Sequence, residues 1–272
     1  MKRTTYILIA LIILGIAAAF AYPLLYTMSQ LRNPSPMKLT SGQTVTTSTP
    51  PFSRLEVKLT GNRQIYTNVL LDVFADSTLS APQLTMTGGW SEWATISNND
   101  STLTIDINLP EIDGIEDENR IWSKTELPAT LRIPAITPLH GISVSETDRS
   151  TLSLHNLTSE TFDAKGFRYL QLDSCRITNL TNDVRYNWNG ELTANASTLR
   201  RVDLLFDHAG NFTVDNSNSA PIDTLVLRPE SNGDHLYLTN ALVNTLLMRP
   251  AYPDSDIDLI LGAQTLTGAL TK

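Results

Sequence analysis

The sequence predicts an all-β domain, built as a β-helical solenoid and attached to a membrane by one N-terminal transmembrane helix. Three observations predict this fold class. The first residues contain one long uncharged, apolar run; many later segments alternate polar and apolar residues; and these segments recur at a regular spacing. Alternation of period two places the apolar side chains of a strand on one face of a sheet.

The N-terminal segment has the properties of a membrane-spanning helix. Residues 6–26 carry no charge and are rich in Ile, Leu and Ala, and Lys2 and Arg3 precede them. About 20 apolar residues span a bilayer as a helix. Basic residues stay on the cytoplasmic side. We therefore predict that residues 1–28 are a membrane anchor or signal sequence, that residues 6–26 contact the lipid bilayer, and that the rest lies outside the cytoplasm, periplasmic or surface-exposed. Ala19-Phe20-Ala21 has the form of a signal-peptidase site, so cleavage stays open.

Residues 29–51 are predicted to be a linker. Ser and Thr are the commonest residues in this stretch, and Pro34, Pro36, Pro50 and Pro51 interrupt it. Such a composition buries too little apolar surface to offset the entropy of ordering. It predicts a semi-extended stalk, followed by an extracytoplasmic domain over residues 52–272.

From Phe52 onward the periodicity is that of strands. Residues 54–59 and 102–107 alternate polar and apolar, and residues 150–154, 169–172 and 223–227 do the same. Apolar pairs two residues apart then recur, mostly at intervals of about 10 residues, a spacing typical of short consecutive strands. One gap near residue 180 is about twice as long, and Phe162 falls midway in another, shorter gap. The pairs are Ile142/Val144, Leu152/Leu154, Leu170/Leu172, Leu192/Ala194, Val202/Leu204, Phe212/Val214, Leu225/Leu227, Leu236/Leu238, Leu246/Met248 and Ile257/Leu259.

Two architectures fit this spacing, a parallel β-helix with two strands in each coil and an antiparallel β-sandwich. Tight antiparallel hairpins favour Asn-Gly or Asp-Gly turns. Asp113-Gly114, Asn189-Gly190 and Asn232-Gly233 alone have that order, and so few of these turns favours the solenoid. In a solenoid the coils stack and share one core. We expect Leu154, Leu172, Val202, Leu204, Leu225, Leu227 and Leu238 to point into that core.

Three segments, residues 52–57, 100–105 and 131–145, carry a family resemblance. They resemble, in turn, the opening strand, the Leu-x-Ile strand and the start of the repeated coils of the putative adhesin, GIN-type domain family of Bacteroidetes-like bacteria, whose members are similar to autotransporter adhesin heads. The stretch 145–147 lacks the glycine common at that point in the family. The resemblance implies a right-handed parallel β-helix outside the cytoplasm, and it carries no catalytic residues.

Composition excludes several classes of function. A formal net charge of −8, without a basic stripe, argues against nucleic acid as a partner. The single cysteine, Cys175, excludes an intrachain disulfide framework and any multi-cysteine metal site. The histidines (His140, His155, His208 and His235) are scattered, and the acidic stretch 111–118 does not match an EF-hand loop. No cofactor and no metal site are predicted.

Two tryptophans form the one candidate partner site. Trp90-Ser91-Glu92-Trp93 follows two glycines, and two exposed rings would offer a stacking platform for sugars. The alternative interpretation is one core residue and one turn residue.

The sequence thus predicts a non-enzymatic cell-envelope protein with a binding, adhesive or structural role, whose partner class is a glycan or an envelope protein. The alternative is a β-helix enzyme active on polysaccharides, a glycosidase or lyase. Glycoside hydrolysis needs two carboxylates that flank the bond, and Asp203 with Asp207, or Asp163 with Asp173, are the candidate pairs. The sequence identifies neither the ligand nor the oligomeric state.

Overall fold

The computed structural model describes residues 44–61, 65–109, 123–145, 149–184, 189–263, 265 and 270–271. The predicted anchor over residues 1–28, with its apolar segment 6–26, lies outside these residues, as does the acidic stretch 111–118. In the described part of the chain, no helix is long and apolar enough to cross a bilayer.

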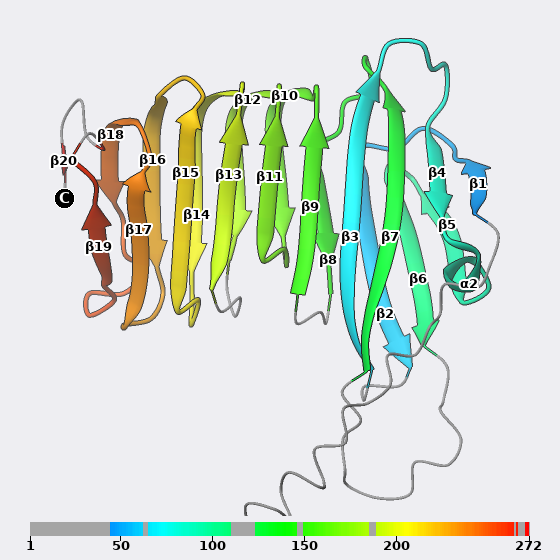
Figure 1. Cartoon of the computed structure of the whole chain (residues 1–272), viewed down its shortest axis with the longest axis horizontal. Helices are drawn as coiled ribbons and strands as arrows, with labels where there is room; N and C mark the ends of the chain where they lie inside the picture. Colours follow the sequence, from blue (N-terminus) through cyan, green and yellow to red (C-terminus); the bar gives the residue numbers. More distant parts are fainter. Residues whose placement is uncertain are drawn as a thin grey trace, which may run out of the picture.

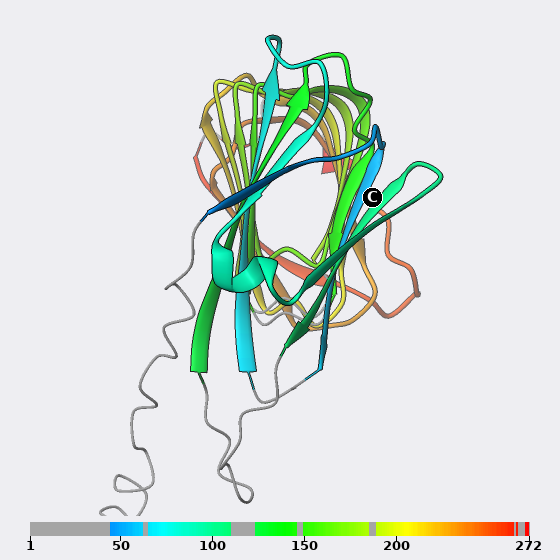
Figure 2. The same ribbon diagram turned by 90° about the vertical axis from the view of Figure 1, so that its right-hand side faces the viewer.

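Two ten-stranded sheets make up the molecule, which confirms the all-β fold class. Sheet A contains, in spatial order, β1 (Val45–Ser48), β4 (Gln83–Met86), β7 (Ser123–Pro134), β3 (Ile65–Asp76), β9 (Arg149–His155), β11 (Tyr169–Asp173), β13 (Gly190–Asn195), β15 (Asn211–Asn218), β17 (Asp234–Asn240) and β19 (Ile257–Leu261). Sheet B contains β20 (Leu270–Thr271), β18 (Val243–Met248), β16 (Ile222–Pro229), β14 (Thr198–Phe206), β12 (Arg176–Asp183), β10 (Thr158–Lys165), β8 (Gly141–Val144), β2 (Arg54–Gly61), β6 (Thr102–Leu109) and β5 (Ala94–Asn99). The two sheets face each other, and the strands follow one another along the long axis (Figures 1 and 2).

From β8 onward the chain alternates between the sheets, and each described strand pairs in parallel with the strand two elements further on. Antiparallel pairing occurs among the described residues only between β1 and β4, β4 and β7, and β5 and β6. From β8 onward the described strands therefore pair in parallel, and not as in the antiparallel sandwich that was the alternative prediction. The sequence indicated this difference through its shortage of two-residue hairpin turns.

A repeated corner joins three strands of sheet A, namely β9, β11 and β13, to the next strand of sheet B. Asn156, Ser174 and Ala196 occupy equivalent corner positions with φ of 58°, 56° and 48°. The backbone N–H of each donates to the carbonyl of the neighbouring coil, on Asp173, Asn195 and Asn218 respectively, at 2.9–3.0 Å. These bonds satisfy a backbone group that would otherwise be left unpaired at the turn.

One apolar core runs between the sheets. All seven residues that we expected in a shared interior are buried and belong to a single cluster of packed side chains. Of the ten apolar pairs, only Met248 and Leu259 are less than fully buried, and both still pack against that cluster. The period-two prediction is therefore confirmed for the core.

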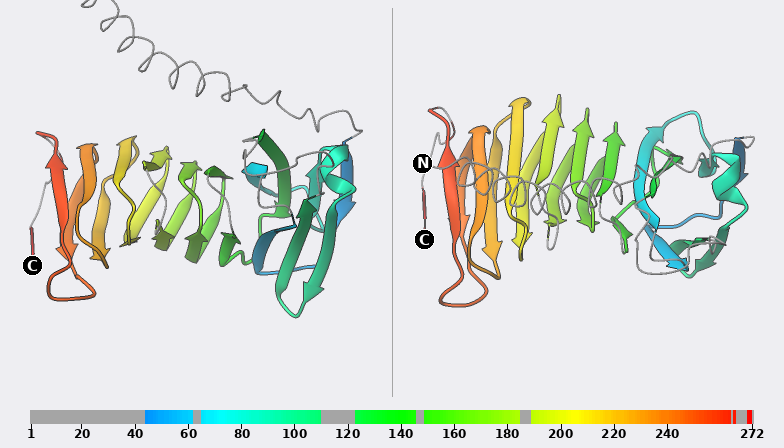
Figure 3. Two further views of the ribbon diagram at one scale, coloured as in Figure 1. Left: turned by 90° about the horizontal axis from the view of Figure 1, so that it is seen from below. Right: turned by 60° about the horizontal axis from the view of Figure 1, so that its bottom comes forward.

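The N-terminal end of the core carries a cap. It consists of the antiparallel strands β1, β4 and β5 and one helical turn, α2 (Gly88–Ser91), at one end of the row of strands (Figure 3). β1 lies within residues 29–51, which the sequence predicted as linker, and Thr49 is buried. A Thr- and Val-rich segment suits the pleated surface of an edge strand, so ordered structure begins before Phe52.

Candidate functional site

The outward face of sheet A carries a row of side chains that contact one another from strand to strand. The row consists of Phe74 on β3, His155 on β9, Asp173 on β11 and Asn195 on β13, which occupy the same register position. We call it the sheet A row. Because neighbouring strands lie about 4.8 Å apart, planar side chains in such a row come into direct contact.

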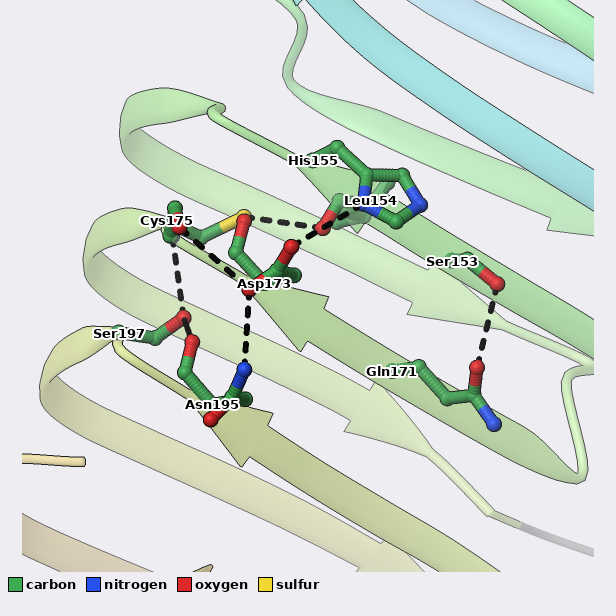
Figure 4. Close-up of polar contacts among 9 residues, drawn as sticks. Ser153, Leu154, His155, Gln171, Asp173, Cys175, Asn195 and Ser197 are labelled. Atoms are coloured by element: carbon green, nitrogen blue, oxygen red, sulfur yellow. Dashed lines mark hydrogen bonds and ion pairs between the residues drawn. The ribbon is translucent and has the colours of Figure 1, made fainter. Parts of the chain in front are cut away.

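The contacts within the sheet A row are an aromatic stack and two polar contacts. The rings of Phe74 and His155 are stacked, with centroids 4.3 Å apart and planes 7° apart. His155 Nδ1 lies 3.6 Å from Asp173 Oδ2, and Asn195 Nδ2 donates to Asp173 Oδ1 at 3.2 Å (Figure 4). Asp173 is thus engaged on both oxygens by its neighbours.

The same pattern recurs further along sheet A. Ser153 Oγ donates to Gln171 Oε1 at 3.4 Å, a contact also drawn in Figure 4. Asn240 Nδ2 donates to Asp215 Oδ2 at 3.2 Å, and Asp215 Oδ1 accepts from both the N–H and the hydroxyl of Ser217. Burial acts to raise the pKa of Asp215, but these hydrogen bonds outweigh it and hold the pKa below its ordinary value. The outer face of sheet A therefore presents fixed carboxylate and amide groups.

A pocket of about 520 Å³ lies at the β3 end of the sheet A row. We call it the Phe74 pocket. It is lined by Phe74, Ala75, Asp76, Ser77, Arg132, Ala135 and Asn156. The volume falls within the range that small-molecule sites occupy.

Hydrogen bonds from the following turn hold Asp76 in place at this pocket. Asp76 Oδ1 accepts from the N–H of Thr78 at 2.8 Å and from its hydroxyl at 2.6 Å. The hydroxyl bond, then the backbone bond, lower the pKa of Asp76, and the positive charge of Arg132 adds to the effect. Arg132 Nη1 lies 4.0 Å from Asp76 Oδ2. A carboxylate and a guanidinium therefore stand side by side next to an aromatic ring.

A second depression, of about 540 Å³, lies on the outer face of sheet B. We call it the β8 groove. Its floor includes Gly141 and Ser143 of the short strand β8, and its walls carry Arg54 and Glu56 on one side and Asp163 and Lys165 on the other. Arg54 Nη2 and Asp163 Oδ2 form an ion pair at 3.2 Å.

Gly141 accounts for this ion pair across the groove. A Cβ at Gly141 would lie 2.9 Å from the carbonyl oxygen of Asp163 and 3.3 Å from Nη1 of Arg54. The missing side chain lets the two charged groups meet above β8. Both side chains are about half exposed, so the pair contributes little to stability.

The structure places the predicted tryptophan site at the cap. Trp90 is fully buried in α2, and its ring meets the partly buried ring of Trp93 edge-on, with centroids 5.8 Å apart. The rings of Trp90 and Trp93 therefore do not offer two exposed faces on which sugars could stack. An open end of a stacked core has to be covered, and Trp90 covers it at this end.

The carboxylates that we considered for catalysis lie on different sheets or have other partners. Asp163 lies on β10 of sheet B and Asp173 on β11 of sheet A. Asp203 is paired with Arg201 at 3.1 Å and Arg228 at 3.6 Å, whereas Asp207 contacts the His208 ring at 2.6 Å. Within the described residues, no group of three or more His, Cys, Asp or Glu side chains is placed to hold a metal ion.

Cys175 belongs to the interior. It is fully buried, its thiol contacts the carbonyl oxygens of Leu154 and Asp173, and its backbone N–H donates to the hydroxyl of Ser197 (Figure 4). Burial raises the pKa of the Cys175 thiol, which disfavours the reactive thiolate.

Sequence reasoning missed Phe74 and Arg132. β3 buries Val69, Leu71 and Val73, so Phe74 follows the last inward position and points outward. The available signal in the sequence was an aromatic residue at an outward position, where the alternation leads one to expect a polar residue. Arg132 cannot be found in this way, because its proximity depends on the pairing of β3 with β7.

No family model matches the chain, and no curated protein matches it. Solved structures do. A putative adhesin from Bacteroides fragilis is 12% identical with a TM-score of 0.48, covering 85% of this chain and 97% of that chain. A putative lipid binding protein from Parabacteroides distasonis is 8% identical with a TM-score of 0.41, covering 85% and 97%. A putative adhesin from Parabacteroides merdae is 10% identical with a TM-score of 0.34, covering 85% and 96%. These superpositions are loose, and we draw no functional argument from them.

Proposed function

We propose that this chain is a non-enzymatic cell-envelope protein: a right-handed parallel β-helix that is held outside the cytoplasm by residues 6–26 and presents its outer faces for binding or adhesion. The observation that carries the proposal is that outward carboxylates of sheet A are held in place by neighbouring groups. Asp173 and Asp215 are engaged on both oxygens by neighbouring side chains or by the following turn. Such groups are fixed in position and suit recognition, in which pre-organisation reduces the cost of binding.

The parallel register supports the β-helix part of the proposal. Each strand from β8 onward matches the one two elements later, so equivalent residues repeat along the axis. A stack of this kind is rigid and elongated, and it exposes long faces. The charge-free segment 6–26 and the Pro-rich residues that follow support a tether.

Thiol labelling tests the location of the domain. Cys175 is fully buried, so the unmodified chain should react little with a membrane-impermeant maleimide. Tyr252 is 62% exposed, and Tyr252→Cys in the full-length chain adds one accessible thiol. We expect labelling in intact spheroplasts and recovery of the labelled chain with the membrane pellet. Labelling that appears only after lysis would contradict export, and a soluble form that begins at Tyr22 would show a cleaved signal.

A hydrolysis assay tests the non-enzymatic part. The full-length chain, in detergent, is incubated with a panel of neutral and uronate-containing polysaccharides, and the release of reducing ends is measured. We expect no turnover above a heat-denatured control. Turnover that is lost in Asp203→Asn or Asp163→Asn would establish the polysaccharide-active enzyme instead.

A further inference from the structure

The aromatic ring in the Phe74 pocket has one face covered and one face turned away from its neighbour. Phe74 pairs in register with His155 on one side and with Arg132 on the other. The His155 ring lies parallel to the Phe74 ring at 4.3 Å and does not line the pocket. The pocket is lined by Arg132 and Ala135 from the β7 side and by Asn156 from the corner after β9, and among the described residues Phe74 has no cation–π contact.

Small apolar groups extend this surface. Ala75 and Ala135 line the pocket, and the backbone N–H of Ala135 donates to the carbonyl of Asp76 at 3.1 Å, which fixes the loop after β7 against β3. The next residue, Ile136, is 94% exposed. An aromatic face beside small apolar groups suits the C–H face of a pyranose ring, which is apolar and flat.

The polar groups of the pocket are held in place by neighbouring groups. Asp76 is fixed by Thr78, and Arg132 stands beside it. Asn156 sits in a left-handed corner whose N–H is bonded to the carbonyl of Asp173, and Ser77 adds a hydroxyl. Together they offer carboxylate and amide acceptors beside guanidinium, amide and hydroxyl donors, a set that matches adjacent sugar hydroxyls.

The charge along the rest of sheet A selects among saccharides. Strands β11, β13, β15, β17 and β19 contain no Lys or Arg, and they carry Asp173, Glu191, Asp215 and Asp258 outside the core, whereas β7 and β9 beside the pocket contain Lys124, Arg132 and Arg149. Arg132 already has Asp76 beside it. An acidic polysaccharide lying along this face would meet like charge, whereas a neutral one would not.

We propose that the Phe74 pocket binds one residue of a neutral saccharide, with the sugar ring stacked on the open face of Phe74 and its hydroxyls bonded to Asp76, Arg132 and Asn156. This inference names a ligand class for the binding role proposed above, and it rests on that role.

A glycan array with the full-length chain in detergent tests the proposal. The array carries neutral hexose and N-acetylhexosamine oligosaccharides beside hexuronate- and sialic-acid-containing ones, and the affinity of the best neutral oligosaccharide is then measured by calorimetry. Phe74→Leu removes the ring and keeps an apolar side chain, and Arg132→Gln removes the charged donor. We expect each to weaken binding roughly tenfold or more.

Two control variants match these substitutions elsewhere. Tyr252→Leu removes an exposed aromatic ring, and Arg200→Gln removes an arginine that is 71% exposed on sheet B. Each should change the affinity by no more than about twofold, as surface substitutions do. Thermal unfolding of all four variants shows whether each one is folded.

The outcomes separate the two proposals. Binding of neutral oligosaccharides that is weakened by both pocket variants and by neither control supports the pocket. Binding of acidic glycans only, binding unaffected by Phe74→Leu and Arg132→Gln in folded protein, or no glycan binding would overturn it. If Tyr252→Cys is still labelled in spheroplasts, the envelope location stands without the pocket.

Discussion

Sheets A and B are built by the same coils, yet their outer faces differ in chemistry. The strands of sheet A from β11 to β19 contain no Lys or Arg, and the outward carboxylates of this sheet contact amides, hydroxyls and histidine. Sheet B carries Lys165, Arg176, Arg200, Arg201 and Arg228 on β10, β12, β14 and β16. Its carboxylates pair with arginines, as Asp203 does with Arg201 and Arg228.

The strands themselves also differ between the sheets. In sheet B each strand from β12 to β18 has two consecutive outward residues between buried ones, namely Thr178-Asn179, Arg200-Arg201, Asp223-Thr224 and Asn244-Thr245. The strands of sheet A alternate more simply, as in β11 and β13. Irregular register occurs instead in sheet A, between β13 and β15 and between β15 and β17. The comparison shows that a repeated register fixes the core while leaving each outer face free to differ.

The largest effect should come from the core that both sheets share. Leu172→Ala in sheet A and Leu227→Ala in sheet B each remove a buried side chain, and each should lower the free energy of unfolding by about 2–5 kcal/mol. Chemical denaturation measures both, with the exposed Thr198→Ala as control. A surface-like cost of about 0.5 kcal/mol at either leucine would show that its sheet does not contribute to one core.

Replacement of a buried asparagine in sheet A should destabilise the fold somewhat less than the two leucine substitutions do. Asn216 is 1% exposed; its Nδ2 donates to the carbonyls of Ala220 and Leu242, and its Oδ1 accepts from the N–H of Leu242. Asn216→Ala removes this partner from the Leu242 N–H and the Ala220 carbonyl, whereas the Leu242 carbonyl still accepts from the N–H of Ile222. The change should destabilise the fold by about 2 kcal/mol. The exposed Asn218→Ala is the matched control. Equal stability of the two variants would mean that these bonds contribute nothing.

Replacement of a buried asparagine in sheet B should change the free energy of unfolding in the opposite direction. Asn182 is also 1% exposed, but among the described residues neither of its side-chain polar atoms has a hydrogen-bond partner, and it lies in register between Ala164 and Leu204. Asn182→Leu should raise the free energy of unfolding by about 1 kcal/mol, because an unpaired buried amide is costly. Asn179→Leu, an exposed change on the same strand, should not stabilise. A loss of stability at Asn182→Leu would point to a bonding partner for the amide.

The smallest expected effect is the loss of an ion pair in sheet B, and its size should depend on the salt concentration. Asp203→Asn weakens the ion pairs with Arg201 and Arg228, whose side chains are 35% and 37% exposed, and should cost less than about 1 kcal/mol at low ionic strength. At about 1 M salt the Debye length falls to about 3 Å, so the difference from the unmodified chain should shrink. Asp215→Asn, which alters hydrogen bonds in sheet A, should depend less on salt. The reverse order would contradict the contrast between the two faces.

The core could be predicted from the sequence because it depends on period two within single strands. Leu170 and Leu172, or Leu225 and Leu227, reveal their strands without knowledge of any partner. The gap near residue 180 had a local cause. β12 buries Ile177 and Leu180 three residues apart and has Asn182 where its neighbours have Ala164 and Leu204, so no apolar pair marks this strand.

The candidate site could not be predicted in the same way. Trp90 and Trp93 were chosen because they stand close in sequence, yet Trp90 is buried under the cap. Phe74, Arg132 and Asn156 meet at one pocket although they are far apart in sequence. Their proximity depends on the β3–β7 and β3–β9 pairings, which bring together coils that are not consecutive along the chain.

The Phe74 pocket and the β8 groove can be compared directly by measuring whether a bound sugar protects an engineered thiol in each from labelling. Ser77→Cys places a thiol in the Phe74 pocket on sheet A, and Ser143→Cys places one in the β8 groove on sheet B, while Cys175 stays buried. The rate of maleimide labelling is measured for the full-length chain with and without a saturating neutral oligosaccharide. We predict that the sugar slows labelling at Ser77→Cys and leaves Ser143→Cys unchanged. Protection at Ser143→Cys alone, or at neither position, would contradict the assignment of recognition to the face of sheet A.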